Sequence, residues 1–414
     1  MYWLVLLYVI VFYTQPGSRF PMLGAIRIEL LIGVVILGGV LLTKWQMLVR
    51  LTRLNKAIFI FFSSLCFSFF GAVWTHTASH SIDVLLNIFK FFSIYIMMIG
   101  TINSERKLRL FTWVYIGSIC FYYTEPFLLS LRGLNFHYEG GMMHLMGVGQ
   151  FAHYNSLGGI TASNLAFLAQ LFFYYGWLLK VLFLVFAGIG MRVIMLTGSR
   201  TAYVGVIMLG ILLVFFSKHK IRNFILIAII GVGLFTLMPQ EYKARFMTLQ
   251  KATQVVEGEQ VQDSMSTRWQ IIKDAWNVFL KYPLVGCGLD SFYQIRGLLF
   301  GRWQQTHNLY MQVLTDMGIV GFVSFIYLLV TIWKYIVFIK HRLKINREEK
   351  SYLYRLATAI QMFLIMRLTV GMFGMDLYEN YWWLMAGFSA VIYRLVQNKI
   401  DCKNRTKHFS KKGI

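Results

Sequence analysis

Three basic side chains occupy positions from which they could act on a phosphorylated substrate: Arg200, Arg268 and His307. A guanidinium group forms forked hydrogen bonds with phosphate oxygens, so an arginine cluster suits a phosphate or pyrophosphate ligand. An imidazole can accept a proton from a hydroxyl group that attacks as a nucleophile. Together these side chains indicate a site that binds an anionic phosphate and activates a hydroxyl group.

Arg268 lies in the first turn of a predicted amphipathic helix. The run Asp263-Ser-Met-Ser-Thr-Arg-Trp269 supplies capping residues, and apolar residues then recur every three or four positions as far as Phe279. A cation is slightly unfavourable at a helix N-terminus, so an anionic ligand would favour Arg268 there. The alternative is a contact with lipid phosphate by a side chain that extends along the membrane surface.

His307 lies before the helical run Leu309-Tyr-Met-Gln-Val-Leu314. We expect Thr306 to be the N-cap of this helix and His307 to lie in its first turn. The positive end of the helix would then keep the imidazole neutral, and a neutral imidazole can accept a proton from a sugar hydroxyl. Asn308 could orient either the histidine or the sugar. The alternative is a structural or interfacial histidine.

Further arginines lie within or beside apolar runs, where a charge is costly and usually faces a polar interior or a partner. Arg200 lies in a small-residue turn between two predicted spans, and Arg192 lies two turns earlier. Arg367 lies inside a later span, towards the same side of the membrane. For Arg367 the alternative to ligand binding is an ion pair, with Glu125, Asp376 or Glu379 as the possible partners.

The composition indicates a membrane protein. Of 414 residues, 57% are hydrophobic and 14% are charged, and the mean hydropathy is +0.60. A soluble protein carries about a quarter charged residues, so this chain has too few charges for an aqueous surface of its size.

The net charge of +23 does not indicate nucleic-acid binding. Lys and Arg cluster in short segments between apolar runs, which is the distribution that the positive-inside rule describes. No basic stripe carries the interleaved aromatic residues of a nucleic-acid groove. The four cysteines are scattered, and the acidic residues of the polar segments lack paired spacing, so we expect no metal site and no cofactor.

Apolar runs of about twenty residues predict about twelve membrane-spanning helices in an all-α bundle. The predicted spans are 1–14, 22–42, 57–74, 82–100, 109–131, 154–176, 178–196, 202–216, 221–238, 317–339, 354–373 and 381–397. The domain organisation follows from them: the first nine spans within 1–238, one long polar segment with short amphipathic helices at 239–316, the remaining spans within 317–397, and a basic tail at 398–414.

The basic residues predict the orientation of these spans. Those between the second and third, fourth and fifth, eighth and ninth, and tenth and eleventh spans all fall on one side, together with the basic tail. The positive-inside rule assigns that side to the cytoplasm, so both termini are predicted to be cytoplasmic. The outer side then receives 132–153, the turn at Ser199-Arg200, 239–316 and 374–380, and these segments must cooperate in any site.

A series of short motifs resembles, in its order and spacing, the O-antigen ligase and O-antigen polymerase superfamily of bacterial membrane proteins. The resemblance covers roughly residues 145–335. The motifs are Gly149-Gln-Phe-Ala-His-Tyr-Asn155, Leu196-Thr-Gly-Ser-Arg-Thr-Ala202, Ser266-Thr-Arg-Trp269, Phe279-Leu-Lys-Tyr-Pro-Leu-Val-Gly-Cys-Gly288 and Thr306-His-Asn-Leu-Tyr-Met-Gln-Val-Leu-Thr-Asp-Met-Gly-Ile-Val-Gly321.

The resemblance implies a GT-C-like helical bundle in the bacterial inner membrane that needs no metal. Such a protein takes a glycan from an undecaprenyl-pyrophosphate-linked donor at the periplasmic face. A ligase passes the glycan to a sugar of lipid A–core, and a polymerase passes it to another lipid-linked repeat unit. By motif position His307 would activate the acceptor hydroxyl, and Arg200 and Arg268 would bind the pyrophosphate. The possible supporting residues are Asn155, Arg192, Asn308 and Arg367.

Several interpretations stay open at this point. Trp303-Gln-Gln-Thr306 lacks the second histidine that some ligases carry two residues upstream, so ligase is only slightly favoured over polymerase and over protein-glycosylating relatives. A lipid-linked glycan transporter would also have many spans. A transporter should, however, concentrate ionisable residues near the bilayer midplane and repeat them in the two halves of its chain. In this chain, polar residues gather in one outer segment. A scaffold subunit would tolerate the loss of His307.

Overall fold

The computed structural model of the chain describes residues 1–26, 28–49, 52–139, 142–149, 152–236, 240, 242–243 and 265–411. Most of the first part of the predicted outer segment, 244–264, lies outside the described residues, as do Gln150 and Phe151 of the first motif.

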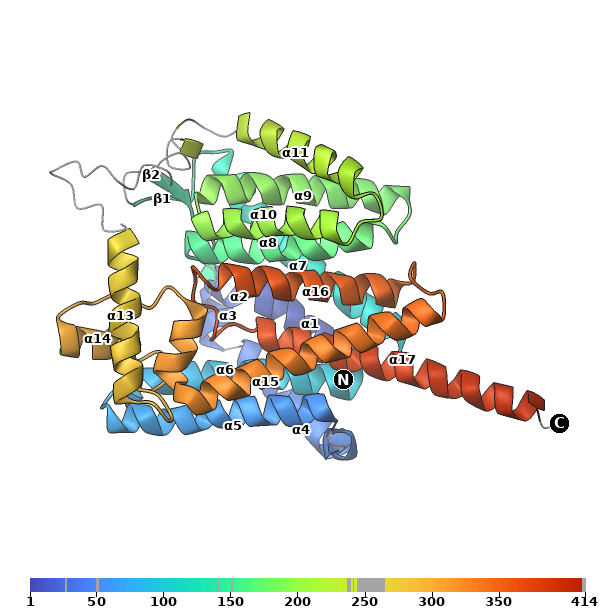
Figure 1. Ribbon diagram of the computed structural model, residues 1–414, viewed down its shortest axis with the longest axis horizontal. Coiled ribbons are helices and arrows are strands. Elements are labelled where there is room, and N and C mark those ends of the chain that lie inside the picture. Colours follow the sequence, from blue (N-terminus) through green and yellow to red (C-terminus); the bar gives the residue numbers. More distant parts are fainter. Residues whose placement is uncertain are drawn as a thin grey trace.

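Long helices packed roughly along one axis form the body of the molecule (Figure 1). They are α1 (Tyr2–Thr14), α4 (Ile28–Val49), α5 (Arg53–Trp74), α6 (Ala78–Thr101), α7 (Glu105–Ser130), α8 (Tyr154–Phe172), α9 (Trp177–Thr197), α10 (Arg200–Phe215), α11 (Lys220–Thr236), α15 (Leu309–Ile345), α16 (Tyr352–Val370) and α17 (Tyr381–Lys411).

Short elements gather at one end of this bundle, on the left in Figure 1. Among them, α13 lies across the axis of the long helices, with α14 beside it. These elements are α2 (Pro16–Arg19), α3 (Pro21–Ala25), α13 (Met265–Lys281), α14 (Phe292–Phe300) and the strands β1 (Phe136–Glu139) and β2 (Met142–Leu145).

Each predicted span overlaps one of the long helices, although 22–42 begins on α3, and the prediction of an all-α membrane protein is confirmed. Within the described residues, five helices are long and apolar enough to cross a membrane: α5, α6, α9, α15 and α16. The shorter helices α1 and α10 are also apolar. Membrane crossing by the other helices, and therefore the full number of spans, stays a prediction.

A β-hairpin is the exception to the all-helical prediction. It lies in the loop predicted at 132–153, where β1 and β2 pair antiparallel with Phe136 opposite Leu145 and His137 opposite His144. The signal was present in the sequence, because Gly140-Gly141 between two short runs is a typical two-residue hairpin connection.

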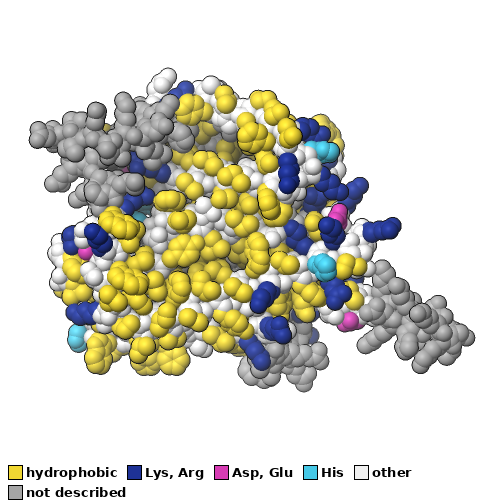
Figure 2. Space-filling model, viewed as in Figure 1, with side chains coloured by type: hydrophobic (Ala, Val, Ile, Leu, Met, Phe, Trp, Pro, Cys, Tyr) yellow, Lys and Arg dark blue, Asp and Glu magenta, His cyan; other side chains and the backbone are white. Residues whose placement is uncertain are grey.

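Hydrophobic and basic side chains occupy different parts of the surface, as expected for a protein embedded in a membrane. Hydrophobic side chains cover the middle of the face drawn in Figure 2, and Lys and Arg gather towards its right-hand end. That end carries the connections from α10 to α11 and from α15 to α16, and lies opposite α13 and α14 (Figure 1). The charge asymmetry supports the predicted orientation, in which the α13 end faces outward.

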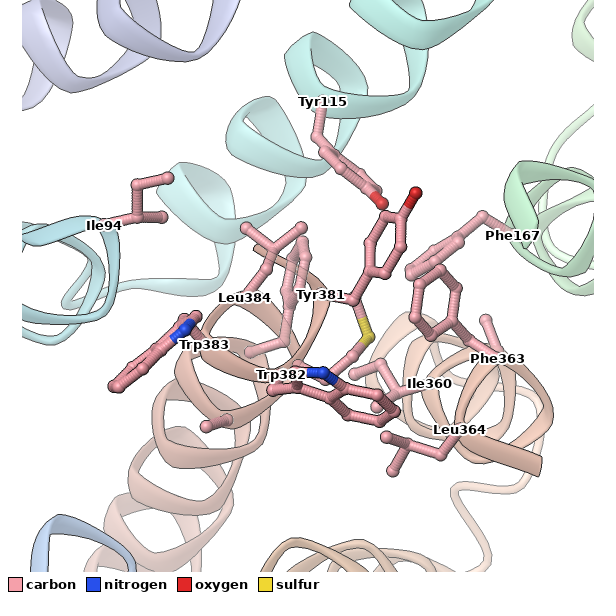
Figure 3. Close-up of a cluster of buried hydrophobic side chains, with 14 of the residues drawn as sticks. Ile94, Tyr115, Phe167, Ile360, Phe363, Leu364, Tyr381, Trp382, Trp383 and Leu384 are labelled. Atoms are coloured by element: carbon pink, nitrogen blue, oxygen red, sulfur yellow. The ribbon is translucent and has the colours of Figure 1, made fainter. Parts of the chain in front are cut away.

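Aromatic side chains from four helices meet inside the bundle (Figure 3). Tyr115 of α7 and Phe167 of α8 make an edge-to-face contact with ring centroids 5.5 Å apart. Phe363 of α16 and Tyr381 of α17 make a second such contact at 5.7 Å, beside the fully buried Trp382. Aromatic pairs of this kind add to the stabilisation from burial, and they join α16 and α17 to α7 and α8.

A glycine interrupts α15 near its first turns. Gly318 has φ +63°, a conformation that costs a residue with a side chain more than it costs glycine. The loop between α13 and α14 satisfies the backbone groups that the break releases: Ile319 N–H donates to the Pro283 carbonyl, and Cys287 N–H donates to the Thr315 carbonyl, both at 2.8 Å. The break therefore attaches the outer segment to α15, which runs across the boundary predicted between 316 and 317.

Candidate functional site

The turn that carries Arg200 is built by its neighbours in the sequence. Gly198, at φ +60°, ends α9 in the left-handed conformation, and the Ser199 side chain caps α10 by accepting from the Ala202 amide. Arg200 is therefore the first residue of α10, and its side chain is partly exposed. Ser199 Oγ also donates to Asn155 Oδ1 at 2.7 Å, so Asn155 joins the start of α8 to this turn.

Two residues that the sequence analysis did not single out hold the same turn. His144 of β2 is buried, and its Nδ1 lies 2.7 Å from the Thr197 carbonyl oxygen. The Tyr242 hydroxyl donates to the Leu196 carbonyl at 3.2 Å and to the Met143 carbonyl at 2.7 Å. No local pattern could have revealed these contacts, because they join segments about fifty to a hundred residues apart.

The structure corrects the expected position of His307. The N-cap of α15 is Asn308, not Thr306, and its side-chain oxygen accepts from the amides of Tyr310 and Met311, each at 3.0 Å. His307 therefore precedes the helix instead of lying in its first turn. Its side chain is exposed and its φ of +46° is unusual for a residue with a side chain. Asparagine competes well for the cap because it is among the strongest N-cap residues, ahead of threonine.

The residues after His307 are anchored to the last turn of α16. Asn308 Nδ2 donates to the Met372 carbonyl at 3.0 Å, and the Leu309 amide donates to the Gly371 carbonyl at 2.7 Å. Asn308 thus uses both ends of its amide to set the position of the backbone beside His307. Because the residues that follow it are fixed in this way, His307 can be held in an unfavourable backbone conformation.

Arg268 lies in the first turn of α13, as predicted, and is partly exposed. The apolar face of α13 packs on the loop that follows it and on α14, and Met311 in the first turn of α15 joins the same cluster. The cluster consists of Ile271, Ala275, Val278, Cys287, Phe292 and Ile295. The helix that carries Arg268 is therefore attached to the helix that begins just after His307.

Arg367 forms the ion pair that was the alternative to ligand binding. Its side chain is 3% exposed and pairs with Asp376 in the turn between α16 and α17. Its NH1 group also donates to Ser163 Oγ of α8 at 3.3 Å. Of the other possible partners, Glu125 pairs with Arg19. Arg367 is thus surrounded by protein, whereas Arg192 is exposed on α9 and has no hydrogen bond or ion pair within the described part of the chain.

Glu379, which is partly buried, adds a second carboxyl group to the turn between α16 and α17. Its pKa is raised to about 8, mainly by burial and also by the neighbouring Asp376, while Arg367 opposes the rise. Glu379 Oε2 and Asp376 Oδ2 have no hydrogen-bond partner among the described residues. From the sequence, these residues were expected only as possible partners for Arg367.

The first turns of α10 and α13 and the start of α15, which carry or adjoin Arg200, Arg268 and His307, lie at the same end of the bundle, on the left in Figure 1. The two helices that begin at Arg200 and just after His307 both contact the end of α16: Gly205 packs against Val370, and Leu309 packs against Gly371. Among the residues that the structure describes, no group of three or more His, Cys, Asp or Glu side chains could hold a metal ion.

Comparison with known families found one match. Residues 191–326 match the family model described as O-antigen ligase, a range that begins in α9 and ends in α15. No curated protein matches the chain. The fold is that of an α-helical membrane protein, and its residues 191–326 are similar to the O-antigen ligase family. The chain contains an O-antigen ligase domain, so the resemblance predicted from its motifs is confirmed.

Proposed function

We propose that this protein transfers a glycan from an undecaprenyl-pyrophosphate-linked donor to a sugar hydroxyl at the periplasmic face of the bacterial inner membrane. The observation that carries the proposal is that one family match, at 191–326, contains Arg200, Arg268 and His307. These residues belong to separate elements at one end of the bundle, where α13 packs on α15 and both α10 and α15 pack against the end of α16.

The arginines would bind the leaving group. Arg200 begins α10, where the helix N-terminus adds its own positive potential to the guanidinium charge. Arg268 lies in the first turn of α13, at the same end of the molecule. Pyrophosphate leaves readily once its charge is neutralised, so groups fixed at the position of the developing charge lower the barrier to transfer.

His307 would act as the general base. Its exposed side chain can meet an acceptor, and the anchored residues 308 and 309 fix the backbone from which it projects. The acceptor oxygen forms a bond with the anomeric carbon, while the bond from that carbon to the pyrophosphate oxygen breaks. The hydroxyl proton passes to His307, and undecaprenyl pyrophosphate leaves with the electron pair.

Ligase activity towards lipid A–core is the version we favour, and repeat-unit polymerase activity is the alternative within the same chemistry. A transporter of lipid-linked glycans is the alternative of another class. It is less well supported, because the buried pair of Arg367 and Asp376 lies at the end of α16 and not at its middle, where a transport site would be expected.

The test is glycan profiling of a deletion strain complemented with the wild type, His307→Ala or Arg200→Ala at equal expression. We expect both variants to lose surface glycan and to accumulate lipid-linked donor. Unattached full-length chains would indicate a ligase, and single repeat units on the acceptor would indicate a polymerase. His137→Ala and Arg132→Ala are matched controls, since both residues are exposed in the outer loop at 132–153. Normal glycan in both test variants would refute the proposed site.

A further inference from the structure

The segment that carries His307 has no regular secondary structure between Arg302 and Asn308, yet its path is set by side-chain contacts. Arg302 and Gln304 are tied to a buried ion-pair cluster on α13 and α14. Gln305 Nε2 donates to Asp290 Oδ1 at 3.1 Å. Asn308 completes the series by its bond to the end of α16. His307 thus lies between residues that are anchored on both sides.

The centre of the cluster is Asp274 of α13. Its carboxylate accepts from Arg296 Nε of α14 at 2.9 Å, from Arg302 NH2 at 3.1 Å and from Gln270 Nε2 at 2.9 Å. The side chains of Asp274 and Arg296 are 2% and 1% exposed. Arg296 also donates from NH1 to Gln304 Oε1 at 3.0 Å. One buried carboxylate therefore holds two arginines, and through them two positions of the segment before His307.

The geometry of this cluster indicates a role in positioning the segment before His307 more than a role in stabilising the fold. A buried ion pair contributes little net stability compared with apolar side chains of the same volume, but it defines one geometry. Arg296 uses different nitrogen atoms for Asp274 and for Gln304, which the single ammonium group of lysine could not reproduce. The contacts also lie on the side of His307 away from α15, where no helix fixes the backbone.

We propose that Asp274 is a positioning residue for His307, acting through Arg296 and Arg302. The inference rests on the proposed function, in which His307 accepts the proton of the acceptor hydroxyl. Asp274 itself touches neither donor nor acceptor in this scheme. It holds the 302–308 segment so that the imidazole meets the hydroxyl at the distance that proton transfer requires, and small displacements of a catalytic group reduce rates strongly.

The first test measures the segment directly, without activity. Hydrogen–deuterium exchange of the full-length protein is followed in peptides that cover 301–310, for the wild type, Asp274→Asn and Arg296→Lys. We expect faster exchange in both variants within this segment. Glu105→Gln is the matched control, because it breaks an ion pair with Arg109 at the opposite end of the bundle. Exchange in Asp274→Asn that equals the wild type would overturn the proposal.

The second test links the cluster to the reaction. With purified lipid-linked donor and acceptor, we expect Asp274→Asn to lower kcat by roughly tenfold or more while KM for the donor stays the same. Full activity of His307→Ala would sink the proposed function itself. A different outcome is that His307→Ala loses activity, while Asp274→Asn shows faster exchange but keeps the wild-type kcat. That outcome would refute only the positioning role of Asp274.

Gln304→Ala keeps the proposal testable if Asp274→Asn does not fold. This change removes one contact of Arg296 and leaves the buried ion pair in place. We expect a smaller increase in exchange in the same peptides and a smaller fall in kcat. If Gln304→Ala leaves both quantities at their wild-type values, the link from the cluster to His307 is refuted.

Discussion

Ser199 Oγ donates a hydrogen bond to Asn155 Oδ1 at 2.7 Å and thereby joins the first turns of α8 and α10. The same hydroxyl caps α10 by accepting from the Ala202 amide. Because Arg200 follows Ser199 directly, the bond to Asn155 contributes to the position of its guanidinium group. Two motifs that lie 44 residues apart in the sequence are therefore parts of one support for Arg200.

Asn155→Ala should weaken donor binding. The change removes the acceptor for Ser199 Oγ but leaves the cap of α10, so Arg200 gains freedom while the helix persists. Loss of one such hydrogen bond costs about 1 kcal/mol, which corresponds to a rise in KM for the donor of roughly fivefold. Steady-state kinetics with lipid-linked donor would measure it. Asn103→Ala is the control, since this residue bonds Lys107 at the other end of the bundle. An unchanged KM would contradict the prediction.

Two variants of Asn308 should distinguish its role as the cap of α15 from its role in positioning His307. Asn308→Ala removes both functions, and we expect it to lower stability by about 1 kcal/mol and kcat at least tenfold. Asn308→Asp retains the cap oxygen but cannot donate to the Met372 carbonyl. It should therefore retain stability and still lose kcat. Thermal unfolding and single-turnover rates distinguish the two effects. If Asn308→Asp transfers glycan at the wild-type rate, the bond to Met372 has no catalytic importance.

Glu379 should make the protein less stable as the pH rises through the neutral range. Its pKa is raised from 4.5 to about 8 by burial, so the folded protein holds a proton that the unfolded chain has already released. Stability from this group is complete below pH 4.5 and declines until the pH reaches about 8. Glu379→Gln removes this dependence. We expect its unfolding temperature to exceed that of the wild type by a margin that grows between pH 5 and pH 8. A margin that does not change with pH would refute the protonated state.

The buried pair of Arg367 and Asp376 can be tested by comparing a variant that removes one charge with a variant that removes both. Asp376→Asn leaves a guanidinium group in the protein interior, and we expect destabilisation of about 3–5 kcal/mol. The double variant Arg367→Met with Asp376→Leu should recover much of that loss, because it removes both charges. Unfolding in detergent provides the measurement. A stable Asp376→Asn protein with weakened donor binding would show instead that Arg367 serves the substrate.

The sequence alone predicted the helix positions and the residues of the candidate site. Apolar runs located the long helices, because a helix in lipid must satisfy its own backbone groups and expose apolar side chains. Motif order located Arg200, Arg268 and His307, which all lie in the family match. Local capping rules chose Thr306 over Asn308 for α15. Two polar residues separated only by His307 compete for one cap, and the Met372 carbonyl favours Asn308.

The tertiary structure alone decided which polar groups meet. The bond from Ser199 to Asn155, the cluster around Asp274 and the pairing of Arg367 with Asp376 each join separate elements. Hydropathy and helical periodicity describe one segment at a time, so they identify a charged residue without naming its partner. The partner depends on how helices rotate and pack against one another, and that is settled by burial of apolar surface across the whole bundle. For this protein, the sequence determined the positions of the apolar helices and the polar residue types of the candidate site, and packing determined which of those residues are brought together.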